Sequence, residues 1–203
     1  MIFISLYFCF SIFLIKQLNI LYPKKDINLI LSNIHAFITF FNSFFYLTKI
    51  IDINLYINIS SISIIYACYD IYLLNLINDN NFKNMLIHHS ILIIGNIWIN
   101  LNKNEFVTNI IAYNYLTEIS TPFLNLSLYL YQNKKTHIYK KIFKISNILL
   151  LITFFLFRIL LGMYLVKITL FYNNYSFLQI ILWFLNLYWF SKLLKKSIEF
   201  VIN

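Results

Sequence analysis

The chain has 203 residues, of which 61% are hydrophobic, 20% aromatic and only 11% charged, with a formal net charge of +9. A soluble domain carries about 25% charged residues, and a water-soluble globule of this length cannot bury so much apolar surface. These proportions exclude a soluble enzyme, a nucleic-acid-binding module and a disordered chain. They predict an all-α, multi-pass transmembrane helical bundle. Cys9 and Cys68 both lie in apolar runs, which gives no disulfide framework.

Seven segments are long and apolar enough to cross about 30 Å of hydrocarbon. They cover residues 2–21, 28–48, 55–77, 85–101, 106–131, 143–166 and 176–194. The first has no basic region before it and no small-residue cleavage site, so we interpret it as an anchor and not as a removed signal peptide. Because the connections are short, we expect a single transmembrane domain over residues 1–203 with about seven spans.

Lysines are distributed unequally between the two membrane faces that seven spans define. One face carries Lys16, Lys24, Lys25, Lys83, Lys134, Lys135, Lys140, Lys141, Lys144, Lys192, Lys195 and Lys196. The other carries Lys49, Lys103 and Lys167. Basic residues are enriched in cytoplasmic loops. The distribution therefore predicts a lumenal or extracellular N-terminus and a cytoplasmic C-terminus.

Ionisable residues also occur inside the predicted spans, where they are costly and usually mark a site or a buried pair. They are His35, Asp70, His88, His89, Glu118 and Arg158. The two adjacent histidines lie just inside the cytoplasmic end of their span, and Asp70 lies about two turns from the same side. Glu118 and Arg158 are nearer the midplane. An isolated arginine at that depth needs a partner, so we expect Arg158 to be a structural counter-ion of Glu118 or Asp70.

Polar residues recur at helical spacing on one face of several spans. In the second span they are Ser32, His35, Thr39, Asn42, Tyr46 and Lys49; in the fifth they are Asn114, Glu118, Thr121 and Asn125, where Pro122 predicts a kink or a freed carbonyl. Tyr66 and Asp70 are one turn apart. This phase predicts a polar cavity on the cytoplasmic side, lined by His35, Tyr66, Asn114, Glu118 and Asn125. The alternative is that the Ser, Thr and Asn side chains form hydrogen bonds that hold the helices together.

The paired histidines carry the most specific chemistry. Histidine titrates near neutral pH, so beside a carboxylate it can act as a general base, and the neutral ring can act as a nucleophile. Consecutive residues point about 100° apart on a helix, so His88 and His89 must have different surroundings. Zinc or iron would suit His with Asp or Glu. Adjacent histidines chelate one ion poorly, however, so we expect no metal and no cofactor.

Six blocks of sequence resemble, in order, those of the TLC family, which contains TRAM, the Lag-type ceramide synthases and the ceroid-lipofuscinosis protein of the endoplasmic reticulum. The blocks are SNIHAF, YDIYLL, MLIHHSILIIG, YLTEISTPFLN, FFLFRI and LNLYWFSKLLK. Ser90 follows the histidines directly, and Glu118 stands in the region where ceramide synthases have an Asp pair. In this respect the chain is similar to the TMEM-type TLC-domain proteins.

Two functions follow from this resemblance. The first is membrane lipid homeostasis by binding, sensing or trafficking lipids, with sphingolipids or ceramide as partners and no nucleic acid. The second is acyl transfer of the ceramide-synthase type, with acyl-CoA as a substrate and His88, His89 and Asp70 as catalytic residues. In that case the lysines at 134–144 attract the phosphates of the coenzyme; otherwise they set topology and contact anionic lipid. The resemblance also implies the endoplasmic reticulum as location.

Overall fold

The computed structural model describes residues 24–76, 82–132, 137–171 and 176–202, and these ranges contain helices and no strand. The all-α prediction is therefore confirmed. The first predicted span, residues 2–21, lies outside the described residues. The chain forms two compact units, residues 1–116 and 117–203. The prediction of a single transmembrane domain stays a prediction.

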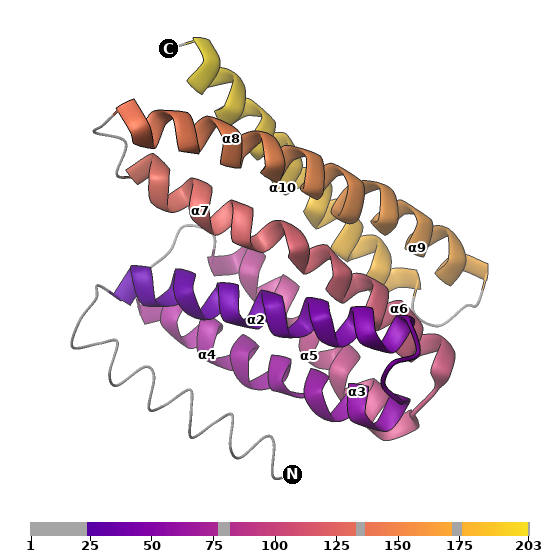
Figure 1. Ribbon diagram of the computed structural model, residues 1–203. Helices are drawn as coiled ribbons and strands as arrows, with labels where there is room; N and C mark the ends of the chain where they lie inside the picture. The colour runs from indigo at the N-terminus through magenta and orange to yellow at the C-terminus, as the bar shows by residue number, and fades with distance from the viewer. Residues whose placement is uncertain (1–23, 77–81, 133–136, 172–175, 203) are drawn as a thin grey trace. The chain divides into compact units, whose positions relative to one another are not determined.

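The first unit is built from five described helices. They are α2 (Lys24–Leu47), α3 (Ile53–Ser60), α4 (Ile62–Leu76), α5 (Phe82–Asn102) and α6 (Glu105–Leu116). Helices α3 and α4 follow one another across Ser61, whose hydroxyl and backbone N–H both donate to the carbonyl of Ile57. Helix α2 packs against α3, α4 and α6, and α4 packs along α5 (Figure 1).

The ends of these helices follow from local residues. Asp52 is the N-cap of α3, and its carboxylate accepts a hydrogen bond of 2.7 Å from the backbone N–H three residues later. Asn104 accepts a similar bond of 3.1 Å at the start of α6. Lys49 and Lys103, which follow α2 and α5, adopt left-handed backbone conformations with φ of 60° and 46°. Such a residue closes a helix by bonding its N–H to an unpaired carbonyl, and a lysine there also complements the negative end of the helix dipole.

The second unit contains the elements η1 (Thr117–Ser120), α7 (Thr121–Gln132), α8 (His137–Thr153), η2 (Phe154–Leu160), α9 (Leu161–Phe171) and α10 (Ser176–Ile202). Element η1 is a 3-10 turn, and it ends just before Pro122. Proline has no N–H to donate to the carbonyl four residues earlier, so the α-helical pattern is interrupted at this point. Helix α7 then packs along α8.

Residues 137–171 form one continuous helix, in which the seven residues of η2 are π-helical (Figure 1). Helix α10 returns antiparallel along it. The ring of Phe154 stacks on that of Phe190 with centroids 5.8 Å apart, and Asn147 Nδ2 donates to Ser197 Oγ over 2.8 Å. The core of this unit lies in the same region, around Leu150, Phe154 and Ile159.

Polar residues face inward and large apolar residues face outward on helix α2. His35, Thr39 and Asn42 are at most 4% exposed. Four phenylalanines of the same helix are 39–48% exposed, namely Phe37, Phe41, Phe44 and Phe45. In water this arrangement would expose the apolar face to solvent. In a membrane the apolar face contacts lipid, and the polar face forms hydrogen bonds with other helices.

Four described helical segments are long and apolar enough to cross a membrane. They are Asp26–Leu47, Ile53–Leu76, Lys140–Phe171 and Ser176–Ile198, and they correspond to the predicted spans 28–48, 55–77, 143–166 and 176–194. The predicted spans 85–101 and 106–131 are helical but are not among the four. The first carries two Asn residues and two histidines, and the second carries three Asn residues and Glu118, which makes both less apolar. The count of about seven spans is thus not confirmed.

Candidate functional site

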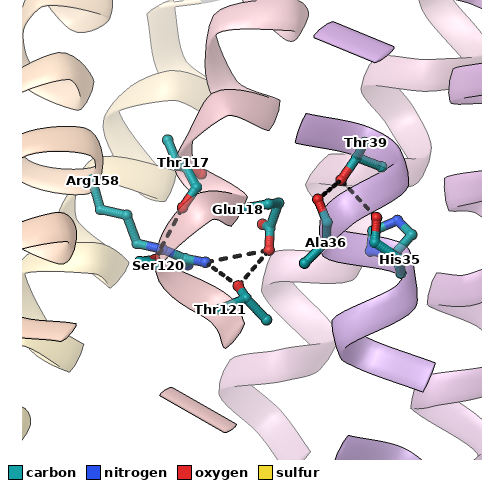
Figure 2. A network of polar contacts seen from close by, with 8 residues as sticks. All are labelled: His35, Ala36, Thr39, Thr117, Glu118, Ser120, Thr121 and Arg158. Atoms are coloured by element: carbon teal, nitrogen blue, oxygen red, sulfur yellow. Dashed lines mark hydrogen bonds and ion pairs between the residues drawn. The ribbon is translucent and has the colours of Figure 1, made fainter. Parts of the chain in front are cut away.

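Two helices of the first unit meet at His35. Its Nε2 lies 3.0 Å from Ser63 Oγ on α4. Its ring stacks on that of Tyr66, one turn further along α4, with centroids 3.9 Å apart and an angle of 13° between the planes. Thr39 donates its hydroxyl to the backbone carbonyl of His35 over 2.9 Å (Figure 2). The histidine is 3% exposed, so its ring is almost fully enclosed by protein.

A buried histidine–carboxylate pair joins α4 to α5. His89 Nε2 lies 2.6 Å from Asp70 Oδ2, and each residue is 2% exposed. When Asp70 is ionised, its carboxylate only accepts hydrogen bonds, so Nε2 then carries the hydrogen and the bond is of the short, charge-assisted kind. The edge of the Tyr66 ring also contacts His89, with centroids 5.8 Å apart. Tyr66 therefore touches both His35 and His89 and connects the two histidines within this unit.

The far atoms of this pair have no hydrogen-bond partner among the described residues. They are Asp70 Oδ1 and His89 Nδ1, and both are buried. A buried polar atom left unpaired costs roughly 1–3 kcal/mol, so such an atom calls for an explanation. When the ring is neutral, with its hydrogen on Nε2, both atoms are acceptors. The pair therefore offers two buried acceptors, one on each residue, to groups that donate hydrogen bonds.

His88 and His89 differ in surroundings, as their angular separation on a helix requires. His89 is 2% exposed and bonded to Asp70, whereas His88 is half-buried. The two rings meet edge to face with centroids 5.3 Å apart. The sequence could not decide which of the two pairs with the carboxylate; the helix rotation set by packing against α4 decides it.

Other polar side chains of the first unit make bonds between helices. Asn100 Nδ2 donates to Ser61 Oγ over 3.0 Å, and Asn96 Nδ2 donates to the Tyr115 hydroxyl on α6. Asn42 Nδ2 donates to the Tyr56 carbonyl over 3.1 Å. These contacts match the alternative in which amides and hydroxyls hold the bundle together, at about 0.6 kcal/mol each.

The second unit has its own buried charged group, on Arg158 (Figure 2). Its Nε donates to Ser120 Oγ over 2.8 Å, and its Nη2 donates to Thr121 Oγ1 over 2.9 Å. The same Nη2 lies 3.4 Å from Glu118 Oε2, which also accepts a bond of 2.6 Å from Thr121 Oγ1. Arg158 is 5% exposed and Glu118 is 8% exposed. Of the two acidic partners that the sequence offered, Arg158 pairs with Glu118, while Asp70 pairs with His89.

The π-helical turn positions this arginine. Seven residues of η2 wind more widely than an α-helix, which changes the direction of the side chains after Phe154. The Arg158 guanidinium lies 5.2 Å from the centre of the Phe154 ring. The carbonyl of Ile159 accepts a bond of 3.1 Å from Trp183 Nε1 on α10. A backbone acceptor in this turn is thus satisfied by a side chain of the neighbouring helix.

The predicted cavity residues are divided between the two units. His35 and Tyr66 lie with the His89–Asp70 pair in the first unit. Asn114 is half-buried on α6 and donates to the carbonyl of Ile110 in its own helix over 3.0 Å. Glu118 and Asn125 are buried in the second unit. The described contacts bring His35, Tyr66, Asp70, His88 and His89 together.

Two contact residues were not singled out from the sequence. Ser63 lies three residues before Tyr66 and seven before Asp70, so helical phase places all three on one face of α4, and this signal was available. Ser120 is different, because its contact with Arg158 depends on the 3-10 turn and the π-helical turn. Periodicity with 3.6 residues per turn does not predict either.

The described helices and buried polar groups define a class of protein: an α-helical integral membrane protein with ionisable groups inside its bundle. The sequence profile of the TLC domain matches residues 1–195, and the chain belongs to the TLC domain family. Comparison with curated proteins and with solved structures gave no match. Among the described residues, no group of three or more His, Cys, Asp or Glu side chains is placed to hold a metal ion.

Proposed function

We propose that this TLC-domain protein acts in membrane lipid homeostasis by binding a lipid at the site formed by His35, Tyr66, Asp70, His88 and His89. The observation that carries the proposal is the pair of unpaired buried acceptors, Asp70 Oδ1 and His89 Nδ1. They favour a lipid whose polar group donates hydrogen bonds. Hydroxyl, amine and amide N–H groups do so, and ceramide and other sphingolipids, which the family resemblance suggests, carry such groups.

The experiment compares two photoactivatable lipids of similar chain length. A ceramide probe has hydroxyl and N–H donors, whereas a phosphatidylcholine probe has no such donor. We expect the purified protein to be labelled several-fold more by the ceramide probe, and Asp70→Asn to remove this preference because it replaces one acceptor by a donor. Ser61→Ala is the matched control, since it breaks a hydrogen bond between helices of the same unit but touches neither acceptor. Equal labelling by both probes would exclude this mode of binding.

A second candidate function, acyl transfer from acyl-CoA to a lipid amine, is favoured by the short bond between His89 and Asp70. The carboxylate orients the imidazole, so that Nδ1 can take a proton from an attacking amine. In this reaction the amine nitrogen forms a bond to the thioester carbon, the carbon–sulfur bond breaks, and the coenzyme leaves as a thiol after receiving the proton. Asp70 and His89 would act as orienting group and base, with His88 beside them.

An assay with acyl-CoA and a long-chain amine separates the two candidates. Under the acyl-transfer hypothesis the wild-type protein forms amide product, and His89→Ala reduces the rate by two orders of magnitude or more, as expected for a lost general base. Under the lipid-binding hypothesis no amide forms, although the ceramide probe still labels the protein. Labelling and turnover together therefore assign the site to one function or the other.

We further propose that the protein resides in the endoplasmic reticulum, with its N-terminus in the lumen and its C-terminus in the cytoplasm. The lysine distribution supports the orientation, and the family resemblance supports the organelle. This orientation places the histidine pair near the cytoplasmic surface, where a water-soluble coenzyme thioester has access.

A further inference from the structure

Lysines collect at one end of the helix pair formed by residues 137–171 and α10. Lys140, Lys141 and Lys144 lie near the start of α8, and Lys192, Lys195 and Lys196 lie near the end of α10. All six are exposed. Because the helices are antiparallel, the start of α8 and the end of α10 are at the same end of the pair. We name these six residues the lysine ladder.

The hydrogen bond between Asn147 and Ser197 brings these two residues to the same level along the helix axes, and the positions of the six lysines can be compared with it. Lys144 and Lys140 are three and seven residues before Asn147, which places them about 4.5 and 10.5 Å beyond this bond along the helix axis. Lys192 is five residues before Ser197 and lies about 7.5 Å on the opposite side of it. The ladder thus has an outer tier on α8, formed by Lys140, Lys141 and Lys144, and an inner tier on α10, formed by Lys192, Lys195 and Lys196.

The inner tier lies where the hydrocarbon ends. A span of about 20 residues crosses the bilayer, so a span that begins at Ser176 ends near Lys195. Lys192 Nζ lies 4.4 Å from the centre of the Tyr188 ring, and this tyrosine is 44% exposed. An exposed tyrosine beside a lysine is typical of the membrane interface. The outer tier lies further out, at the level of the lipid headgroups and the water next to them.

The charge of the ladder is not neutralised within the described side chains. Among the described residues, the ion pairs are His89–Asp70 and Arg158–Glu118, and neither involves a lysine of the ladder. Glu118 is buried on Arg158 in the same unit. By sequence Glu199 is the one acidic residue of α8, η2, α9 and α10, and its side chain lies outside the described residues. Six cations against one anion leave a net positive charge that attracts anionic lipids from the facing leaflet.

We propose that the lysine ladder binds a phospholipid whose headgroup carries one or more phosphates beyond the phosphodiester. The phosphodiester lies at the level of the inner tier, and the additional phosphates reach the outer tier. A lipid with a single phosphate meets only the inner tier. The site lies in the second unit and uses none of the residues of the histidine–carboxylate site.

The test uses the full chain in phosphatidylcholine vesicles that contain either phosphatidylserine or a phosphatidylinositol bisphosphate, adjusted to equal total headgroup charge. Lipid retained after extraction in mild detergent is measured by native mass spectrometry. The wild-type protein should retain the bisphosphate at least about tenfold better than phosphatidylserine, given the attraction that each lysine near the surface contributes. Equal retention of the two lipids would overturn the proposal.

Three triple variants assign the tiers. Replacing the outer tier (Lys140, Lys141 and Lys144→Gln) should remove the preference for the bisphosphate and leave phosphatidylserine retention nearly unchanged. Replacing the inner tier (Lys192, Lys195 and Lys196→Gln) should lower retention of both lipids. The control, Lys49, Lys103 and Lys167→Gln, removes the same charge elsewhere and should retain both lipids like the wild type. An outer-tier variant that retains the bisphosphate normally would show that the outer tier does not bind it, and Asp70→Asn should leave all these results unchanged.

Discussion

At the scale of single residues, the main feature is that two buried pairs of ionisable side chains, one in each unit, are bonded in different ways. His89 and Asp70 form one close contact of 2.6 Å, while each has a far atom without a described partner. Arg158 divides its donors between a carboxylate 3.4 Å away and two hydroxyl groups at 2.8 and 2.9 Å. The arginine is thus held by its surroundings, which fits a structural role, whereas the histidine pair keeps bonding capacity for another group.

The two adjacent histidines should differ in their effect on stability. His89→Ala leaves the buried Asp70 carboxylate without its partner, and removing one member of a buried pair costs about 3–5 kcal/mol. His88 is half-buried, so His88→Ala should cost less, on the order of 1 kcal/mol. Thermal unfolding of both variants in the same detergent measures the difference. If the two melting temperatures fell equally, the unequal roles given to the histidines would be wrong.

The Arg158–Glu118 contact should show energetic coupling. Arg158→Leu leaves a buried Glu118 and should reduce the yield of folded protein sharply, by about 3–5 kcal/mol in stability. Glu118→Gln is milder, because the arginine keeps its bonds to Ser120 and Thr121. The double variant should lose less stability than the two single variants lose together, by about 0.5–3 kcal/mol. Strict additivity in a double-mutant cycle would show that the pair does not interact.

At the scale of helices, the close contact at Gly162 determines how α9 meets α10. A Cβ at this position would lie 2.9 Å from Trp183 Cδ1, which is closer than real contacts allow. Trp183 cannot move easily, because its Nε1 is bonded to the Ile159 carbonyl. Gly162→Ala should therefore destabilise the protein by about 1–3 kcal/mol through overpacking.

Gly95→Ala provides the control for this prediction. Its Cβ would approach the end of the flexible Ile111 side chain at 3.3 Å, so a small shift of that side chain accommodates it. Alanine also has the higher helix propensity, by up to about 1 kcal/mol. We expect Gly95→Ala to unfold at nearly the wild-type temperature. A Gly162→Ala variant as stable as Gly95→Ala would show that Trp183 has room to move.

Helix positions could be predicted from the sequence better than helix contacts. Apolar runs gave the segments at 28–48, 55–77 and 176–194 close to their observed limits, because the length needed to cross lipid is a strong constraint. The phase of polar residues in α2 gave His35, Thr39, Asn42 and Tyr46 correctly as buried positions, whereas Lys49, which was assigned to the same face, is exposed beyond the end of the helix. The π-helical turn at Phe154–Leu160 could not be predicted, since it depends on side chains from other helices, such as Trp183.

The candidate site shows the same limit. Helical phase placed Tyr66 and Asp70 on one face of α4, and the cost of charge in lipid indicated that Asp70 needs a partner. The sequence did not indicate which residue is the partner of Asp70, because the rotation of α5 against α4 is set by packing along their full length. Glu118 and Asn125 were grouped with this site because of their helical spacing; both belong to the second unit, where Glu118 is bonded to Arg158, and their grouping with the first unit stays a prediction.

At the scale of the whole molecule, the distribution of charge predicts the orientation in the membrane. Seven spans would put twelve lysines on the face of the C-terminus and three on the other. Since lysine-rich loops stay in the cytoplasm, a C-terminal tag should be digested by protease added to sealed microsomes, and an N-terminal tag should be protected. Detergent should expose both tags. Digestion of an N-terminal tag in intact microsomes would contradict this orientation, and digestion of both would indicate an even number of spans.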